Sequence, residues 1–414
     1  MPPLLRIEEP ATAAPHAPQW QAFLEMGFRP LYLAGCAWAA LSVALWVFAP
    51  QWILGPLNAV FWHAHEMLWG FVATIAVGFL LTAGGAWTGV NPMRGRPLAA
   101  LCGLWLAARI LFLVPGTVAF GLAALCELAF FAWGALAMGR VVYGQRSQRN
   151  YGVPVLMLAL GAADALFLLA VARGEYDLLL SRFNTGLLCM AVIALLVTRR
   201  VTPFFASRAV PGLEIPMQLR SGHVQLATGC AAILFSLLGW SLPQALALAI
   251  TGALPLYHVI SWKPLAVRHK PILWILYAGY AGLGAGLLLA AAHEAGWILR
   301  EAWPAHAIGT GGFAVLIIGM VTRTALGHLG RPLQTDRSMV ASYVLVIVAA
   351  VLRLVALVPG GFTLAALHAS TTAWVLAFAL YLWRFVPYMI RPRADAGVAG
   401  KNSAGIPLRP GAKK

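Results

Sequence analysis

Residues 62–87 read WHAHEMLWGFVATIAVGFLLTAGGAW. His63 and His65 stand at the start of this stretch, and no charged residue occurs between Glu66 and Arg94. About 20 consecutive apolar residues are enough for a helix to cross the hydrocarbon core of a bilayer. The stretch therefore predicts a membrane-spanning helix that carries two histidines and one acid near its first turn.

The rest of the chain repeats this pattern. Of 414 residues, 61% are hydrophobic and 10% charged, and the mean hydropathy is +0.80; an ordinary soluble domain has about 25% charged residues. This composition excludes a soluble enzyme and a disordered chain, and the unbroken apolar runs exclude a β-barrel, whose strands alternate. We predict an all-α, polytopic membrane protein with about twelve transmembrane helices, near residues 30–49, 62–86, 97–114, 117–138, 152–172, 183–203, 222–240, 243–262, 271–292, 303–325, 338–358 and 363–388.

The predicted helices form one transmembrane domain, residues 28–390. We expect residues 1–27 to be a cytoplasmic N-terminal segment and residues 391–414 to be a disordered, basic cytoplasmic tail. Residues 1–18 lack the apolar centre of a signal peptide, so no cleavage is expected.

The distribution of basic residues predicts the orientation. If both termini are cytoplasmic, the outer loops hold only Arg173, Arg182 and Arg300, while Arg109 and Arg353 lie within helices. All other lysines and arginines then fall on the inner side, as the positive-inside rule requires. The net charge of +16 is therefore an orientation signal, and no nucleic-acid partner is expected.

Two distant parts of the chain resemble each other. Trp62-His63-Ala64-His65 opens one helix and Trp303-Pro304-Ala305-His306 opens another, and in each a glycine follows the last histidine after the same interval. In the next helix of each set, Arg109 and Arg353 stand at the same distance before a Pro-Gly pair. We predict three pseudo-symmetric four-helix units; chance similarity between Ala/Leu-rich helices is the alternative. The units lie near residues 28–142, 152–262 and 271–390.

The histidines are the strongest functional candidates, because an ionisable side chain inside a membrane is costly. His65 and His306 occupy equivalent repeat positions, so we predict that they face each other as axial ligands of a haem b, bound without a CxxCH attachment. His63 lies about 200° around the helix from His65. His63, His258 and His328 are further candidate metal ligands, with copper as a possible second metal. The alternative is interfacial histidines bonded to loops.

Arg109 and Arg353 are the second equivalent pair. Bidentate guanidinium groups suit the anionic propionates of haem, so both arginines are candidate cofactor-binding residues. Pairing with Glu127 and snorkelling to the outer interface are the alternatives. Asp164 is a further intramembrane acid, for which the sequence offers no obvious partner.

Several motifs resemble the NnrS family of bacterial membrane proteins, which contain haem and copper and are linked to nitric oxide and denitrification. The stretch WHAHEMLWGF and the block ending in ALGHLGRPL are the most specific of them. The resembling segments are FRPLYLAG (28–35), WHAHEMLWGF (62–71), TAGGAWTG (82–89) with its continuation GRPLAAL (95–101), TRRVTPFF (198–205), KPILWIL (270–276) and HAIGTGGF continuing to TRTALGHLGRPL (306–333).

The resemblance implies a haem- and copper-containing protein of the bacterial inner membrane that protects against nitrosative stress. Its implied partners are nitric oxide or a related small molecule, the lipid bilayer and a membrane electron donor. Tyr277 stands where the family usually has a histidine, which puts one metal site in doubt. The helix plan is also similar to the catalytic subunit of haem-copper oxidases, but the copper-site histidines of helices 6 and 7 are absent, so oxygen reduction is not predicted.

The leading hypothesis is a haem and copper protein that handles nitric oxide, either as a haem-dependent oxidoreductase or without turnover. A transporter of a metal ion or small solute is the alternative, with the histidines as a transit path. A broken helix near the midplane would favour transport. A third possibility is an assembly partner that has no cofactor of its own.

Overall fold

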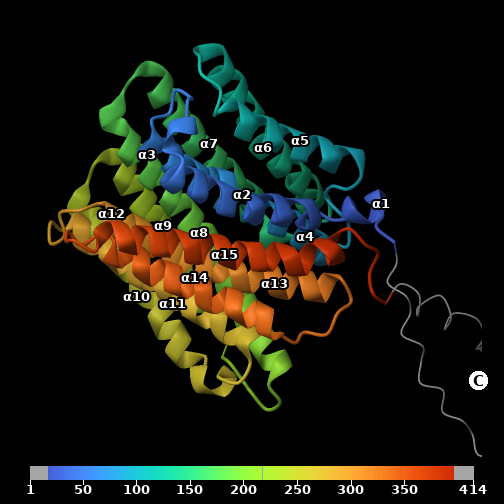
Figure 1. Ribbon diagram of the computed structural model, residues 1–414. Helices are drawn as coiled ribbons and strands as arrows, with labels where there is room; N and C mark the ends of the chain where they lie inside the picture. Colours follow the sequence, from blue (N-terminus) through green and yellow to red (C-terminus); the bar gives the residue numbers. More distant parts are fainter. Residues whose placement is uncertain (1–16, 217, 396–414) are drawn as a thin grey trace, which may run out of the picture.

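The structure is a computed structural model that describes residues 17–216 and 218–395, and within these ranges it contains helices and no β-strand (Figure 1). Eleven helices there are long and apolar enough to cross a membrane, which confirms the prediction of an all-α, multi-pass protein. The predicted tail lies outside the described residues from position 396 onward.

The main elements are α1 Trp20–Phe23, α2 Phe28–Phe48, α3 Ala59–His65, the π-helical segment η2 Glu66–Ala73, α4 Thr74–Thr88, α5 Arg96–Leu111, α6 Thr117–Gly144, α7 Gly152–Arg173, α8 Tyr176–Ala209, α9 Leu219–Leu238, α10 Ser241–Ser261, α11 Pro271–Glu294, α12 Ala302–His306, the π-helical segment η5 Ala307–Ala314, α13 Val315–His328, α14 Arg337–Val355 and α15 Thr363–Met389. Short 3₁₀ turns, Pro50–Trp52, Gln148–Asn150 and Pro264–Val267, connect some of them.

Each of the twelve predicted spans corresponds to a helix, but one of them is shorter than expected. The stretch predicted at 97–114 is α5, which has 16 residues and ends at Leu111. At 1.5 Å per residue α5 is about 24 Å long, less than the hydrocarbon thickness of about 30 Å. The chain turns before Pro115, and Gly116 has a positive φ of 107° that begins the reversal into α6.

Three inner helices are surrounded by the others. The continuous helices α3–η2–α4, α8 and α12–η5–α13 contact one another through η2, α8 and η5. In each inner helix, 67 to 83% of the apolar stretch that could span a membrane is buried. The share is 61% in α11 and 22 to 44% in the other candidate spans. These are the second helices of the three predicted four-helix units. Their meeting at the centre is what a pseudo-threefold arrangement requires.

The first and last long helices close the bundle. Figure 1 shows α2 beside α15, and the two are among the most extensively packed pairs. The indole Nε1 of Trp374 donates to the carbonyl of Ala39 at 2.8 Å, and Arg29 Nη1 donates to the carbonyl of Met389 at 3.0 Å. Both bonds join residues more than 300 positions apart, so they hold the two ends of the domain together.

Two inner helices change their winding at equivalent positions. The segment η2 begins directly after His65, η5 begins directly after His306, and each has eight residues. The i→i+5 winding of a π-helix is rare and is often found at functional sites. Both helices remain hydrogen-bonded through the π segment, so neither is unwound. The shared winding supports the equivalence that the sequence motifs predicted.

Close packing of α11 against α12–η5–α13 depends on glycine. A Cβ at Gly279 would lie 2.6 Å from the backbone nitrogen of Leu316, and one at Gly286 would lie 2.7 Å from that of Ile308. Backbone atoms cannot move aside as the end of a side chain can, so any larger residue forces the two helices apart.

We therefore expect Gly279→Ala to destabilise the protein by about 1–3 kcal/mol through overpacking. Gly103→Ala is the matched control, because a Cβ at Gly103 meets nothing within 4 Å and alanine favours a helix by up to about 1 kcal/mol over glycine. Thermal unfolding in detergent measures both. An unfolding temperature for Gly279→Ala that equals or exceeds that of Gly103→Ala would contradict this packing.

Candidate functional site

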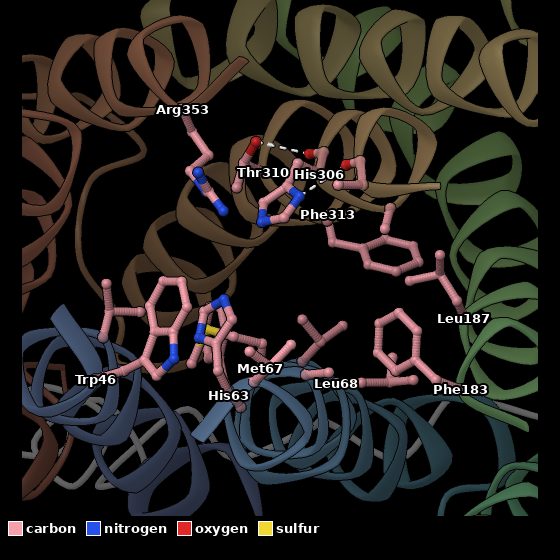
Figure 2. Close-up of a pocket in the computed structure, with 18 of the residues that line it drawn as sticks. Trp46, His63, Met67, Leu68, Phe183, Leu187, His306, Thr310, Phe313 and Arg353 are labelled. Carbon is pink, nitrogen blue, oxygen red and sulfur yellow. Dashed lines mark hydrogen bonds between the residues drawn. The ribbon is translucent and has the colours of Figure 1, made fainter. Parts of the chain in front are cut away.

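A cavity of about 290 Å³ lies between the N-terminal halves of the inner helices α3–η2–α4 and α12–η5–α13. We call it the outer cavity, from the predicted orientation. Most of its walls are apolar, with Phe183, Leu187 and Phe313 at one side. Its polar groups gather at the other side, where His63, His306 and Arg353 point into the opening (Figure 2).

His63 and His306 approach each other across the outer cavity. Their ring centroids are 6.4 Å apart and the ring planes differ by 20°. Nδ1 of His306 lies 2.7 Å from the carbonyl oxygen of Ala302, a contact that requires the proton on Nδ1 and leaves the lone pair on Nε2. His63 stacks on Trp46 at 4.0 Å, and its Nδ1 is buried without a hydrogen-bond partner among the described residues. A buried imidazole nitrogen without a partner is a candidate metal ligand.

Arg353 and Met67 complete the polar side of the outer cavity. The guanidinium carbon of Arg353 lies 5.9 Å from the centre of the Trp46 ring, and within the described chain its nitrogens form no ion pair. The thioether of Met67 lies beside His63 in Figure 2 and lines the same opening. The cavity thus brings together two imidazoles, one thioether, the guanidinium of Arg353 and the carboxylate of Glu301.

His65 lies in a different place, within a buried cluster of charged groups. Its Nδ1 is 3.0 Å from Glu66, and its Nε2 is 3.1 Å from Asp164 and 3.3 Å from Glu127. Arg109 Nη1 lies 2.6 Å from Glu66, and Nη2 pairs with Glu127. All five side chains are at most 2% exposed. We call these five residues the charged cluster.

The charged cluster can hold a proton. Both ring nitrogens of His65 face carboxylate oxygens, so either an imidazolium donates to both sides or a protonated Asp164 donates to Nε2. His65, Glu127 and Asp164 also offer one ligand atom each within 4.8 Å of one another, and an imidazole with two carboxylates is a set that divalent metals accept. Arg109 already supplies positive charge there, which disfavours a cation.

Gly70 makes room for the charged cluster. A Cβ at this position would meet the Arg109 guanidinium and lie 2.6 Å from a Glu66 oxygen. The indole of Trp38 donates to the same Glu66 oxygen at 2.6 Å. Glu66 therefore accepts hydrogen bonds from both an arginine and a tryptophan, and a larger residue at position 70 would displace both donors.

The structure corrects the predicted pairing of histidines. His65 and His306 do not face each other; His63 faces His306 instead, because His65 is turned toward the carboxylates of α6 and α7. Arg109 is occupied by Glu66 and Glu127, so it does not snorkel and is not available to a propionate, and its predicted alternative partner Glu127 is confirmed. Of the two equivalent arginines, only Arg353 lines the outer cavity.

Asp164 has the partner that the sequence did not reveal, namely His65. The five chain positions of the charged cluster span helices α3 to α7, and no local spacing indicates that they meet. The signal in the sequence was the presence of three acids within spans of otherwise apolar residues.

The two inner histidines that were predicted as metal ligands, His258 and His328, have different surroundings. His258 is fully buried and stacks on Trp262; its Nε2 lies 2.9 Å from the Ser221 hydroxyl, and its Nδ1 lies 3.1 Å from the Tyr280 hydroxyl. Both of its nitrogens therefore have partners. His328 packs against Phe28 and lines a second cavity at the opposite end of the bundle.

A family model described as NnrS protein matches residues 22–393. The chain belongs to the NnrS family. A comparison with curated proteins finds no match. NnrS membership associates the chain with the membrane response to nitric oxide. The match covers every residue of the outer cavity and of the charged cluster.

Tyr277 is the residue that the resemblance predicted to differ from the usual family pattern in this NnrS chain. Its hydroxyl donates to the carbonyl of Trp262 at 3.1 Å, and its ring packs edge-on against the Trp262 ring. The tyrosine is thus engaged in holding the end of α10 against α11.

We expect Arg109→Gln to destabilise this NnrS protein by about 3–5 kcal/mol, because it leaves two buried carboxylates without their cation. Arg173→Gln is the control; its exposed pair with Glu175 spans 3.9 Å, and such pairs contribute about 0–1 kcal/mol. Thermal or denaturant unfolding in detergent compares them. Adding Glu127→Gln to Arg109→Gln should restore part of the loss, and the absence of any restoration would argue against the ion pair as its cause.

Proposed function

We propose that the outer cavity binds a haem b between His63 and His306, and that the protein handles nitric oxide at this haem. The observation that carries the proposal is the pair of imidazoles on opposite sides of one apolar cavity. The two rings lie 6.4 Å apart between centroids, and Nε2 of His306 keeps its lone pair because Nδ1 is bonded to Ala302. His63 and His306 would be the residues that hold the haem iron, where the sequence alone indicated His65 and His306.

The surrounding residues support this use of the two histidines. The carbonyl of Ala302 fixes the His306 tautomer, as second-shell acceptors do for metal-bound imidazoles. Trp46 holds the His63 ring by stacking, and the guanidinium of Arg353 is placed to neutralise a carboxylate of the cofactor. Bound there, haem would supply an iron centre that can bind nitric oxide.

The apolar wall formed by Phe183, Leu187 and Phe313 suits the small, neutral, apolar nitric oxide molecule and excludes water. Under the positive-inside orientation, with both termini cytoplasmic in a bacterial inner membrane, the cavity lies toward the outer face. The charged cluster can hold a proton at His65, which shares α3 with His63, or at Asp164 of α7. Such a proton would respond to a charge change at the cofactor. A membrane electron donor would supply electrons.

Copper is the second cofactor proposal. Met67 offers a soft thioether beside His63, and imidazole with thioether is a set that suits copper(I). His258 is less suited, because Ser221 and Tyr280 already occupy both of its nitrogens. Transport of a metal ion or solute is the alternative function; the continuous winding of the inner helices through η2 and η5 gives it no broken helix near the midplane.

We expect the wild-type protein, purified in detergent with haem available, to give a b-type spectrum in the reduced-minus-oxidised difference. His63→Ala and His306→Ala should lose it because each removes an axial ligand. His368→Ala is the matched control, since this outer histidine packs against Phe48 and does not line the cavity. A well-folded wild type without haem, or full haem in both cavity variants, would refute the proposal, and metal analysis of the same samples tests copper.

Arg353→Gln should retain the haem spectrum but release haem to apomyoglobin about tenfold faster, because one charge-assisted hydrogen bond is lost. Arg300→Gln serves as the control: this guanidinium donates to the carbonyl of Leu357 outside the cavity. Equal release rates in the two variants would remove Arg353 from the proposed cofactor site.

A further inference from the structure

A second cavity lies at the opposite end of the inner helices, and it is much larger and strongly basic. Its volume is about 1250 Å³, and no acidic residue lines it among the described residues. We call it the inner cavity. Its basic lining residues are Arg149, Arg199, Arg200, Arg208, Arg323, His223 and His328. Five arginines around one opening create a positive potential that the protein itself does not neutralise there.

Arg323 is the least compensated of these cations. It is 8% exposed, its Nε is buried without a partner, and its side chain forms neither a hydrogen bond nor an ion pair within the described ranges. Its guanidinium carbon lies 3.5 Å from the centre of the Phe205 ring. Aromatic stacking holds the group in place but supplies no counter-charge. A buried guanidinium without an anion is costly in free energy, so we expect an anion to bind beside Arg323.

Arg199 reaches the same cavity from a second inner helix. It occupies in α8 the position that Arg323 occupies in α13, in the matching triplets Val-Thr-Arg. Its Nη1 donates only to the neutral carbonyl of Gln218, at 3.4 Å. A Cβ at Gly222 would collide with the Arg199 guanidinium, so the glycine of α9 leaves the space that the charged group fills.

The walls of the inner cavity show what kind of anion fits. Phe79, Trp87, Phe204 and Trp262 add a large aromatic surface beside the arginines. A free inorganic anion would contact only the arginines. An anionic amphiphile would contact the arginines through its head group and the aromatic wall through its apolar chains. Basic pockets between membrane helices at an arginine-rich membrane face are suited to anionic lipid head groups.

We propose that the inner cavity binds an anionic phospholipid, whose phosphate group lies between Arg323 and Arg199 and whose acyl chains run along the aromatic wall. The site is separate from the outer cavity and shares no lining residue with it. Its phosphate would supply the counter-charge that Arg323 lacks within the described residues and would stabilise the contact of Arg323 on α13 with the Phe205 ring of α8.

The test is a native mass spectrometry titration of the full-length protein in detergent with phosphatidylglycerol, and with phosphatidylcholine as the uncharged comparison. Wild type should form a one-to-one adduct with phosphatidylglycerol, and Arg323→Gln should bind it about tenfold more weakly, since a charge-assisted bidentate contact is lost. Gly222→Ala should weaken binding as well, because it displaces Arg199 without removing its charge.

Arg331→Gln is the matched control. Arg331 also lies over an aromatic ring, at 3.4 Å from the centre of Tyr388, on the same side of the bundle but outside the cavity. It should bind phosphatidylglycerol as wild type does. Arg323→Lys keeps the positive charge at this position, so it shows whether a loss of binding comes from the charge or from misfolding. It should bind phosphatidylglycerol more tightly than Arg323→Gln does.

Inorganic phosphate distinguishes the two sources of the anion. If millimolar phosphate displaces phosphatidylglycerol and gives the same thermal protection, the site binds a free anion and the assignment of a lipid is wrong. If phosphatidylglycerol binds equally to wild type, Arg323→Gln and Gly222→Ala, or no more tightly than phosphatidylcholine, the site itself is refuted.

Discussion

In hydrocarbon, a charged side chain must find its counter-charge within the protein, and Arg109 is the residue at which this constraint acts most strongly. Its ion pairs with Glu66 of η2 and Glu127 of α6 join these two segments to α5, which carries Arg109. His65 extends the network to Asp164 on α7. Because water is not available to replace any of these contacts, the network determines how the helix that carries His65 is rotated.

That rotation decides which histidine reaches the outer cavity. Two residues that are two positions apart on a helix point in nearly opposite directions. Once His65 is turned to the carboxylates of α6 and α7, His63 is turned away from them, toward His306. The buried ion pairs therefore have a structural consequence at a distance, since they place on the wall of the cavity an imidazole whose Nδ1 has no partner among the described residues.

The pseudo-symmetry of the bundle is preserved in the backbone and broken by the charges. The segments η2 and η5 have the same length and the same place after a histidine. However, Glu66 has no counterpart after His306, where Ala307 stands, and the last helix α15 contains no acid. Among the described residues Arg353 forms no ion pair and lines the cavity, whereas its equivalent Arg109 is held in the charged cluster. The arginine of one repeat is thus held by carboxylates, and the arginine of the other faces the cavity.

The sequence by itself determined the all-α membrane architecture, the twelve helices, the equivalence of the two histidine motifs and the family, because these depend on hydropathy and local pattern. The length of α5 was overestimated because its apolar run continues to Val114, past the turn that begins after Leu111. Only the tertiary structure decided that His63 rather than His65 meets His306, that Asp164 belongs to a cluster and that Arg323 has no counter-ion among the described residues. These facts depend on helix rotation and on contacts between residues far apart in the chain, which buried charge governs and which no local spacing records.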